Sequence, residues 1–130
     1  MVEGNKVLVI DDDMSIHAAM KAILAPLGYR VYSAMDALQG PMIVRQLNPD
    51  LVILDISMPA GGGYVVYERI KSFSGTLHIP VLVYSVSPRE EIEKKIAESN
   101  DTRILSKPAR PEQILEAVAF FLPPPAESPR

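Results

Sequence analysis

Five short apolar runs alternate with longer amphipathic stretches along this sequence, and this alternation constrains the fold more than any other feature. We predict strands at residues 6–10, 30–33, 51–54, 81–84 and 103–105. The first, third and fourth runs are almost wholly apolar, which is typical of strands buried on both faces of a sheet. Strands that alternate with helices form parallel sheets with right-handed crossovers. The sequence therefore predicts an α/β fold, a doubly wound five-stranded parallel sheet with helices on both faces.

Apolar residues recur at helical spacing between the predicted strands. The stripe of the first helix consists of Ile16, Met20, Ile23, Leu24 and Leu27. Pro26 is expected to truncate or bend this helix, and Gly28 to cap its C-terminus. In the second helix, over residues 37–47, Pro41 would cost roughly 3 kcal/mol unless it lies in the first turn. The last helix is expected to begin at Pro111.

A sharp helix start is predicted after the fourth strand. Residues 87–90 are Ser-Pro-Arg-Glu, which matches a capping box with proline at the first helical position. Two acidic residues, Glu90 and Glu91, each precede a lysine, Lys94 or Lys95, by four positions. Such pairs are typical of a solvated helix face.

Length and composition fit one globular domain. The chain has 130 residues, of which 48% are hydrophobic and 22% charged. A chain of this length can bury a hydrophobic core without the help of a metal or a disulfide. The absence of cysteine excludes disulfides, thiol nucleophiles and zinc–thiolate sites. We assign residues 1–122 to the domain and 123–130 to a proline-rich tail or linker stub.

Charge and hydropathy exclude several partners. The net charge of −3 gives no electrostatic reason to expect direct nucleic-acid binding. No apolar run approaches the ~20 residues that span a bilayer, and the N-terminus lacks the pattern of a signal peptide. We therefore expect a cytoplasmic location and no membrane partner.

Polar residues follow four of the predicted strands, at the sheet edge where α/β folds build their sites. These residues are 11–13 (Asp-Asp-Asp), Asp55, Ser85 and 106–108 (Ser-Lys-Pro). Because parallel strands bring these ends together, Asp11, Asp12 and Asp55 are expected to lie close to one another. Clustered carboxylates repel unless a cation intervenes, and an all-oxygen acidic set suits Mg²⁺.

Each of these signals alone has an ordinary structural explanation. An aspartate after a strand commonly caps a helix or forms a turn, and Asp13 is expected to cap the first helix. A lone lysine before proline is normally solvated. Together, however, carboxylates, Mg²⁺, the hydroxyl of Ser85 and the ammonium of Lys107 make up a phosphoryl-transfer site, where catalysis is mostly positioning and charge neutralisation.

The ordered set of motifs resembles the receiver domains of two-component response regulators, which include the chemotaxis regulators. The matching stretches are residues 7–13 (VLVIDDD), 49–59 (PDLVILDISMP), Gly63, 79–85 (IPVLVYS) and Lys107-Pro108. The resemblance covers residues 6–122 and implies the flavodoxin-like strand order 2-1-3-4-5. It also implies a phospho-acceptor switch rather than an enzyme, with Mg²⁺ as cofactor. The implied partners are a sensor histidine kinase or phosphotransfer protein, and an output domain or downstream protein.

The resemblance implies a role for each acidic residue of the site. Asp55 is the phospho-acceptor, which attacks the phosphorus of a phosphohistidine on a partner kinase. Asp12 is the principal magnesium carboxylate, and Asp11 assists it. Ser57, two residues past the acceptor, offers its backbone carbonyl to the metal.

The resemblance also implies which residues face the phosphoryl group. Ser85 occupies the position of the switch hydroxyl, and Lys107 pairs with Asp55 or with the phosphate. A cis peptide bond is expected between Lys107 and Pro108. The chain departs from the family at Ile104, where an aromatic residue is usual, and this departure puts the standard relay of the signal in doubt.

Two alternatives remain open on the sequence. A pseudo-receiver would keep the fold as a binding module without phosphorylation. A magnesium-dependent phosphohydrolase would place its nucleophile after the first strand, a pattern that Asp11 and Asp13 can mimic. His17 and His78 are assigned surface or packing roles, and residues 61–63 (Gly-Gly-Gly) a flexible loop in which Gly63 adopts a backbone conformation that other residues resist.

Overall fold

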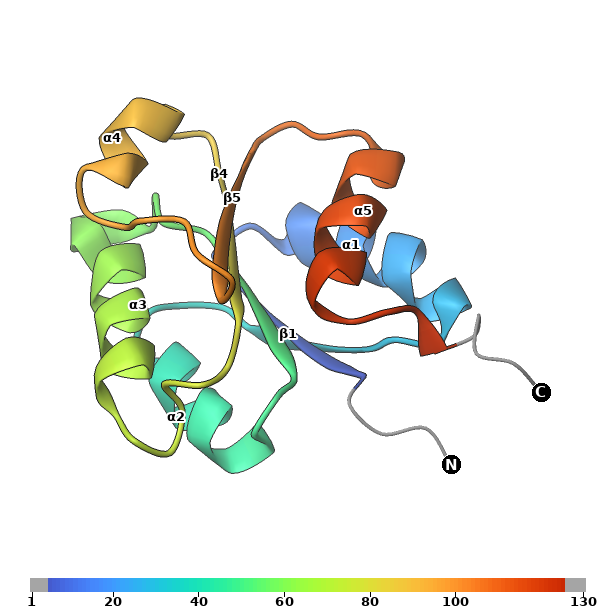
Figure 1. Cartoon of the computed structure of the whole chain (residues 1–130), viewed down its shortest axis with the longest axis horizontal. Coiled ribbons are helices and arrows are strands. Elements are labelled where there is room, and N and C mark those ends of the chain that lie inside the picture. Colours follow the sequence, from blue (N-terminus) through green and yellow to red (C-terminus); the bar gives the residue numbers. More distant parts are fainter. Residues whose placement is uncertain (1–4, 126–130) are drawn as a thin grey trace.

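The computed structural model describes residues 5–125 and confirms the predicted α/β fold (Figure 1). The strands are β1 (Lys6–Ile10), β2 (Arg30–Ala34), β3 (Leu51–Leu54), β4 (Val81–Ser85) and β5 (Thr102–Ser106). The helices are α1 (Met14–Leu24), α2 (Gln39–Leu47), α3 (Gly62–Ser72), α4 (Arg89–Glu93) and α5 (Pro111–Phe121). Short 3₁₀ turns lie at Ala25–Leu27 and Pro59–Gly61.

The sheet is parallel, and its strand order is β2-β1-β3-β4-β5, as predicted. Figure 1 shows α1 and α5 on one face of the sheet and α2, α3 and α4 on the other. Side chains of a strand alternate between the faces. In β1, for example, Val7 and Val9 pack toward α1 and α5, whereas Leu8 and Ile10 pack toward α2 and α3. All four are fully buried, which explains why the runs read as apolar throughout.

Pro26 and Pro41 lie at positions where the missing N–H group of proline costs the helix no hydrogen bond. Helix α1 ends at Leu24, and Pro26 sits in the 3₁₀ turn that follows. Gly28 then ends this segment with a φ of 95°, which confirms the predicted cap. Helix α2 begins at Gln39, later than predicted, so that Pro41 falls in its first turn, where backbone N–H groups have no intrahelical partner.

The predicted capping box at the start of α4 is wrong. Pro88 is the N-cap, and no side chain caps this helix, which spans only five residues. The hydroxyl of Ser87 is instead 2.7 Å from that of Ser57, across the fold. The expected four-residue ion pairs are also replaced: Lys94 pairs with Glu91, and Lys95 lies over the ring of Tyr64.

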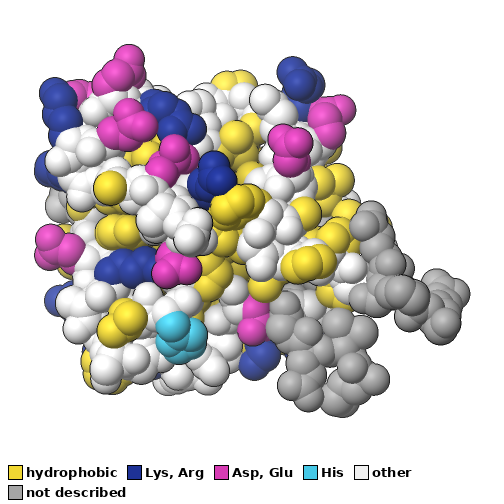
Figure 2. Space-filling model, viewed as in Figure 1, with side chains coloured by type: hydrophobic (Ala, Val, Ile, Leu, Met, Phe, Trp, Pro, Cys, Tyr) yellow, Lys and Arg dark blue, Asp and Glu magenta, His cyan; other side chains and the backbone are white. Residues whose placement is uncertain are grey.

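The surface over α4 is strongly charged, as expected for a solvated face. Figure 2 shows acidic and basic side chains gathered over this helix at the upper left. None of the helices among residues 5–125 is long and apolar enough to cross a membrane. Residues 126–130 of the predicted tail lie outside the described part of the chain.

Candidate functional site

The carboxyl ends of four strands carry the predicted site residues, and backbone hydrogen bonds hold them in place. Asp11 follows β1 and donates its amide to Ala34 at 3.1 Å. Asp55 follows β3 and donates to Ile10 at 3.0 Å, and Lys107 follows β5 and donates to Ser85 at 2.9 Å. These bonds extend the sheet ladder by one step beyond the strands. Asp11, Asp55 and Lys107 are therefore held in place by the sheet itself.

The three predicted carboxylates form one acidic cluster. Oxygen atoms of Asp11, Asp12 and Asp55 lie within 4.8 Å of one another. Asp11 and Asp55 are buried, whereas Asp12 is exposed, so that the cluster opens to solvent on one side. The close approach expected from the strand ends is therefore present.

Asp13, the third acidic residue of the run, has a structural role at the start of α1. Its Oδ1 accepts hydrogen bonds from the amide and the hydroxyl of Ser15, at 2.9 and 2.7 Å, and it caps α1 as predicted. These bonds hold the pKa of Asp13 below its usual range. Asp13 is thus a structural residue and not part of the cluster.

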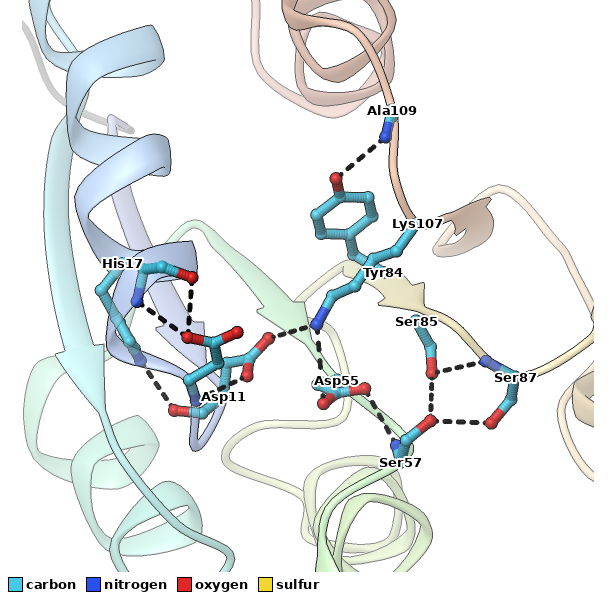
Figure 3. Close-up of polar contacts among 11 residues, drawn as sticks. Asp11, His17, Asp55, Ser57, Tyr84, Ser85, Ser87, Lys107 and Ala109 are labelled. Carbon is cyan, nitrogen blue, oxygen red and sulfur yellow. Dashed lines mark hydrogen bonds and ion pairs between the residues drawn. The ribbon is translucent and has the colours of Figure 1, made fainter.

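Lys107 lies between the two buried carboxylates (Figure 3). Its Nζ is 2.8 Å from Oδ2 of Asp11 and 3.7 Å from Oδ2 of Asp55. Its side chain is 12% exposed, so that both ion pairs are shielded from water. The peptide bond between Lys107 and Pro108 is cis, as expected. Sequence reasoning had paired Lys107 with Asp55, and the shorter contact with Asp11 is an addition from the structure.

A chain of three hydroxyl groups borders Asp55 (Figure 3). The Oγ of Ser57 is 2.6 Å from that of Ser85 and 2.7 Å from that of Ser87. The amide of Ser57 also donates to Oδ1 of Asp55 at 2.9 Å. Sequence reasoning missed the side chains of Ser57 and Ser87. Their spacing in the sequence could have indicated them, because Ser57 lies two residues past Asp55 and Ser87 two residues past Ser85.

The interpretation of the three glycines as a flexible loop is wrong. Gly61 belongs to a 3₁₀ turn, and Gly62 and Gly63 form the start of α3. Positive φ angles occur at Ala60 (58°) and Gly61 (71°), not at Gly63. A Cβ atom at Gly63 would lie 2.4 Å from the Cα of Ile56 and 2.5 Å from the carbonyl oxygen of Asp55. Gly63 is therefore required for the close approach of α3 to the backbone of Asp55 and Ile56.

His17, for which the sequence predicts a surface or packing role, is buried beside the acidic cluster. Its Nε2 is 2.7 Å from the backbone oxygen of Asp11. His78, in contrast, is exposed in the loop before β4. The sequence does not indicate which of the two histidines is buried, because the contact of His17 with Asp11 depends on how α1 packs against the loop after β1.

We expect the Asp11→Asn protein to be more stable than the wild type at neutral pH without divalent cations. Burial raises the pKa of Asp11 above its usual value, and hydrogen bonds from Lys107 and from the Asp13 amide only partly oppose this effect. A carboxyl group whose pKa rises on folding stabilises the fold below its unfolded pKa. That stabilisation is lost as the pH rises through the folded pKa.

Urea unfolding in EDTA at several pH values measures this difference. The stability gained by Asp11→Asn should be largest near pH 7, should shrink as the pH falls through the raised folded-state pKa of Asp11, and should be gone below about pH 4, the usual pKa of an unfolded aspartate. A mutant that is less stable than the wild type at pH 7 would show that the contact with Lys107 outweighs the burial of the charge.

Comparison with known proteins places the chain in a family. Residues 7–119 match the response regulator receiver domain. The DNA-binding dual master transcriptional regulator RpaA of Synechocystis is 34% identical over 119 residues, which are 90% of this chain and 48% of that regulator. The chain thus spans about half the length of that relative. Chemotaxis protein CheY of Treponema pallidum is 32% identical, over 90% of this chain and 82% of its own length.

Solved structures agree with this assignment. Chemotaxis protein CheY4 of Vibrio cholerae superposes with a TM-score of 0.81 at 26% identity, over 90% of this chain and 98% of that chain. The receiver domain of the sensor histidine kinase PA1611 of Pseudomonas aeruginosa shares the fold, with a TM-score of 0.78 at 21% identity over 91% and 97% of the two chains. The chain therefore belongs to the response regulator receiver domain family, the signalling modules of two-component systems.

Proposed function

We propose that Asp55 accepts a phosphoryl group from a phosphohistidine, with Mg²⁺ held at the acidic cluster. The observation that carries this proposal is the position of Lys107, whose ammonium lies between Asp55 and Asp11 beside the exposed Asp12. A buried carboxylate with a neighbouring fixed cation and an acidic opening to solvent suits phosphoryl transfer, in which positioning and charge neutralisation dominate.

Contacts of the two buried carboxylates favour Asp55 over Asp11 as the acceptor. Both oxygens of Asp11 are engaged, Oδ1 by the amide of Asp13 and Oδ2 by Lys107. In Asp55, Oδ1 accepts from the amide of Ser57, whereas Oδ2 makes only the longer contact of 3.7 Å with Lys107. Oδ2 of Asp55 would form the new bond to phosphorus while the bond from phosphorus to the histidine nitrogen breaks. Lys107 and the hydroxyl of Ser85 would then contact the phosphoryl oxygens.

The donor set fits Mg²⁺. Three carboxylates offer oxygen atoms within 4.8 Å of one another, and hard cations of this size take carboxylate, carbonyl and water oxygens. Asp12, Asp11 and Asp55 would hold the ion, together with the backbone carbonyl of Ser57. When bound, it would neutralise charge on the phosphoryl oxygens. The structure of the PA1611 receiver domain, which holds a magnesium ion in its active-site cleft, supports this assignment.

Transmission of the signal runs through the segment after β4 in this proposal. Ile104 is buried, and a β-branched residue has a stiff first side-chain torsion, so that it does not reproduce the movement of an aromatic side chain. Polar contacts tie the segment to β5 instead. Arg89 donates to the carbonyl of Ile104 at 2.6 Å, and the amide of Ile104 donates to Glu98 at 2.9 Å. Residues 85–89 would therefore move when Ser85 turns toward the phosphoryl group.

The partners follow from this chemistry. The phosphoryl donor would be a sensor histidine kinase or a phosphotransfer protein, and the receiver would signal to a C-terminal output domain or to a separate protein. We propose a cytoplasmic module that uses neither a membrane nor direct nucleic-acid contact, and that switches rather than turns over substrate. Residues 1–122 would form the receiver and 123–130 a tail or linker stub. Against the phosphohydrolase alternative, Asp13 caps α1 and does not join the cluster.

Incubation with acetyl phosphate tests this function. We expect intact-protein mass spectrometry to show one added phosphoryl group with Mg²⁺ and none with EDTA. No uptake in Mg²⁺ would contradict the proposal and favour the pseudo-receiver. Steady release of phosphate from a simple phosphomonoester would favour the phosphohydrolase.

A further inference from the structure

His17 is a buried histidine of α1 that contacts the loop carrying the acidic cluster (Figure 3). The residue is 6% exposed, and its Nε2 is 2.7 Å from the backbone oxygen of Asp11. A carbonyl oxygen can only accept a hydrogen bond, so that Nε2 must carry the hydrogen. The imidazole ring is therefore a donor to Asp11.

The other ring nitrogen gives no reason for a histidine at this position. Nδ1 of His17 is buried and makes no hydrogen bond to any group within residues 5–125. An unpaired buried polar atom destabilises a fold, whereas an apolar ring of similar shape would avoid this penalty. The one useful contribution of the imidazole is therefore the hydrogen bond from Nε2 to Asp11.

The acceptor of this bond belongs to the peptide that joins the first two acidic residues of the cluster. The amide of Asp11 is held by Ala34, and its carboxylate is held by Asp13 and Lys107. The carboxylate of Asp12, in contrast, is exposed and has no hydrogen bond or ion pair within the described residues. Its direction depends on the orientation of the peptide before it. His17 contacts the carbonyl of that peptide from α1.

We propose that His17 is a positioning residue of the cation site. Its Nε2–H group holds the peptide between Asp11 and Asp12 so that the Asp12 carboxylate faces Asp11 and Asp55. This inference rests on the proposed function of the acidic cluster as a Mg²⁺ site. It assigns to α1 a part in cation binding although the helix supplies no ligand.

Titration with Mg²⁺ by isothermal calorimetry tests this role. His17→Phe keeps a flat ring but removes the donor, and we expect its dissociation constant for Mg²⁺ to rise about tenfold, as for loss of other groups that orient metal ligands. His17→Gln retains an amide donor and should bind within about threefold of the wild type. His78→Phe, which alters the exposed histidine, should bind as the wild type does.

Urea unfolding in EDTA measures how far each variant is destabilised, and this separates positioning from packing. If His17 positions the site, His17→Phe must lose more Mg²⁺ affinity than a variant that is destabilised to the same degree. If His17→Phe does not fold, His17→Met carries the same prediction. Wild-type affinity in His17→Phe, or equal losses in the Phe and Gln variants, would overturn the positioning role alone. Failure of the wild type to bind Mg²⁺ would refute the cation site itself, and the inference with it.

Discussion

The Asp55→Asn protein is expected to take up no phosphoryl group from acetyl phosphate, whereas the wild type takes up one. An amide is a poor nucleophile, and no other carboxylate of the cluster offers an equivalent oxygen, because Asp11 is engaged on both oxygens and Lys107 contacts Asp55 but not Asp12. Asparagine retains the oxygen that accepts from the Ser57 amide, so that the loop geometry should survive. Intact-protein mass spectrometry in Mg²⁺ measures the uptake directly.

Asp101→Asn is the matched control for this experiment. Asp101 is an exposed aspartate that precedes β5, at the opposite edge of the sheet from Asp55. This variant should be phosphorylated to the same extent as the wild type. Undiminished uptake by Asp55→Asn would show that another residue is the acceptor.

The Gly63→Ala protein is expected to be less stable than the wild type by about 3 kcal/mol, at the upper end of the range for overpacking. The new Cβ would lie 2.4 Å from the Cα of Ile56 and 2.5 Å from the carbonyl oxygen of Asp55. Backbone atoms cannot move aside as the end of a flexible side chain can. Either α3 or the backbone of Asp55 and Ile56 must shift, and phosphoryl uptake should fall as well.

Gly61→Ala separates this steric effect from backbone strain. Gly61 has a φ of 71°, but its added Cβ would meet nothing within 4 Å. Strain alone should cost this variant about 1 kcal/mol. Urea unfolding of the two variants compares them, and a Gly63→Ala protein no less stable than Gly61→Ala would mean that the close approach of α3 is easily relieved.

Strands and their order were predictable because their signals are local or carried by motifs. A strand buried on both faces is almost wholly apolar, and this holds for β1, β3 and β4. The start of α4 was mispredicted because the Ser87 hydroxyl bonds to Ser57, on a distant loop, rather than to its own helix. Likewise, the importance of Gly63 comes from a packing distance and not from its backbone angles.

The acidic cluster was predictable for a related reason. The carboxyl ends of parallel strands meet at one edge, so that aspartates after β1 and β3 must lie close together. What the sequence could not show is how the side chains share their partners. The closer contact of Lys107 with Asp11 and the hydrogen bond from His17 both depend on the packing of side chains across elements.

Locating the phosphoryl group is the most direct test of the central claim. Wild-type protein is treated with acetyl phosphate and Mg²⁺, the acyl phosphate is reduced with borohydride, and peptides are sequenced by mass spectrometry. Reduction converts a phosphorylated aspartate to homoserine, which marks the site. We predict homoserine at position 55 and unmodified Asp11 and Asp12. Homoserine at either of those two positions, or none at all in protein treated with Mg²⁺, would contradict the assignment of Asp55 as the phospho-acceptor.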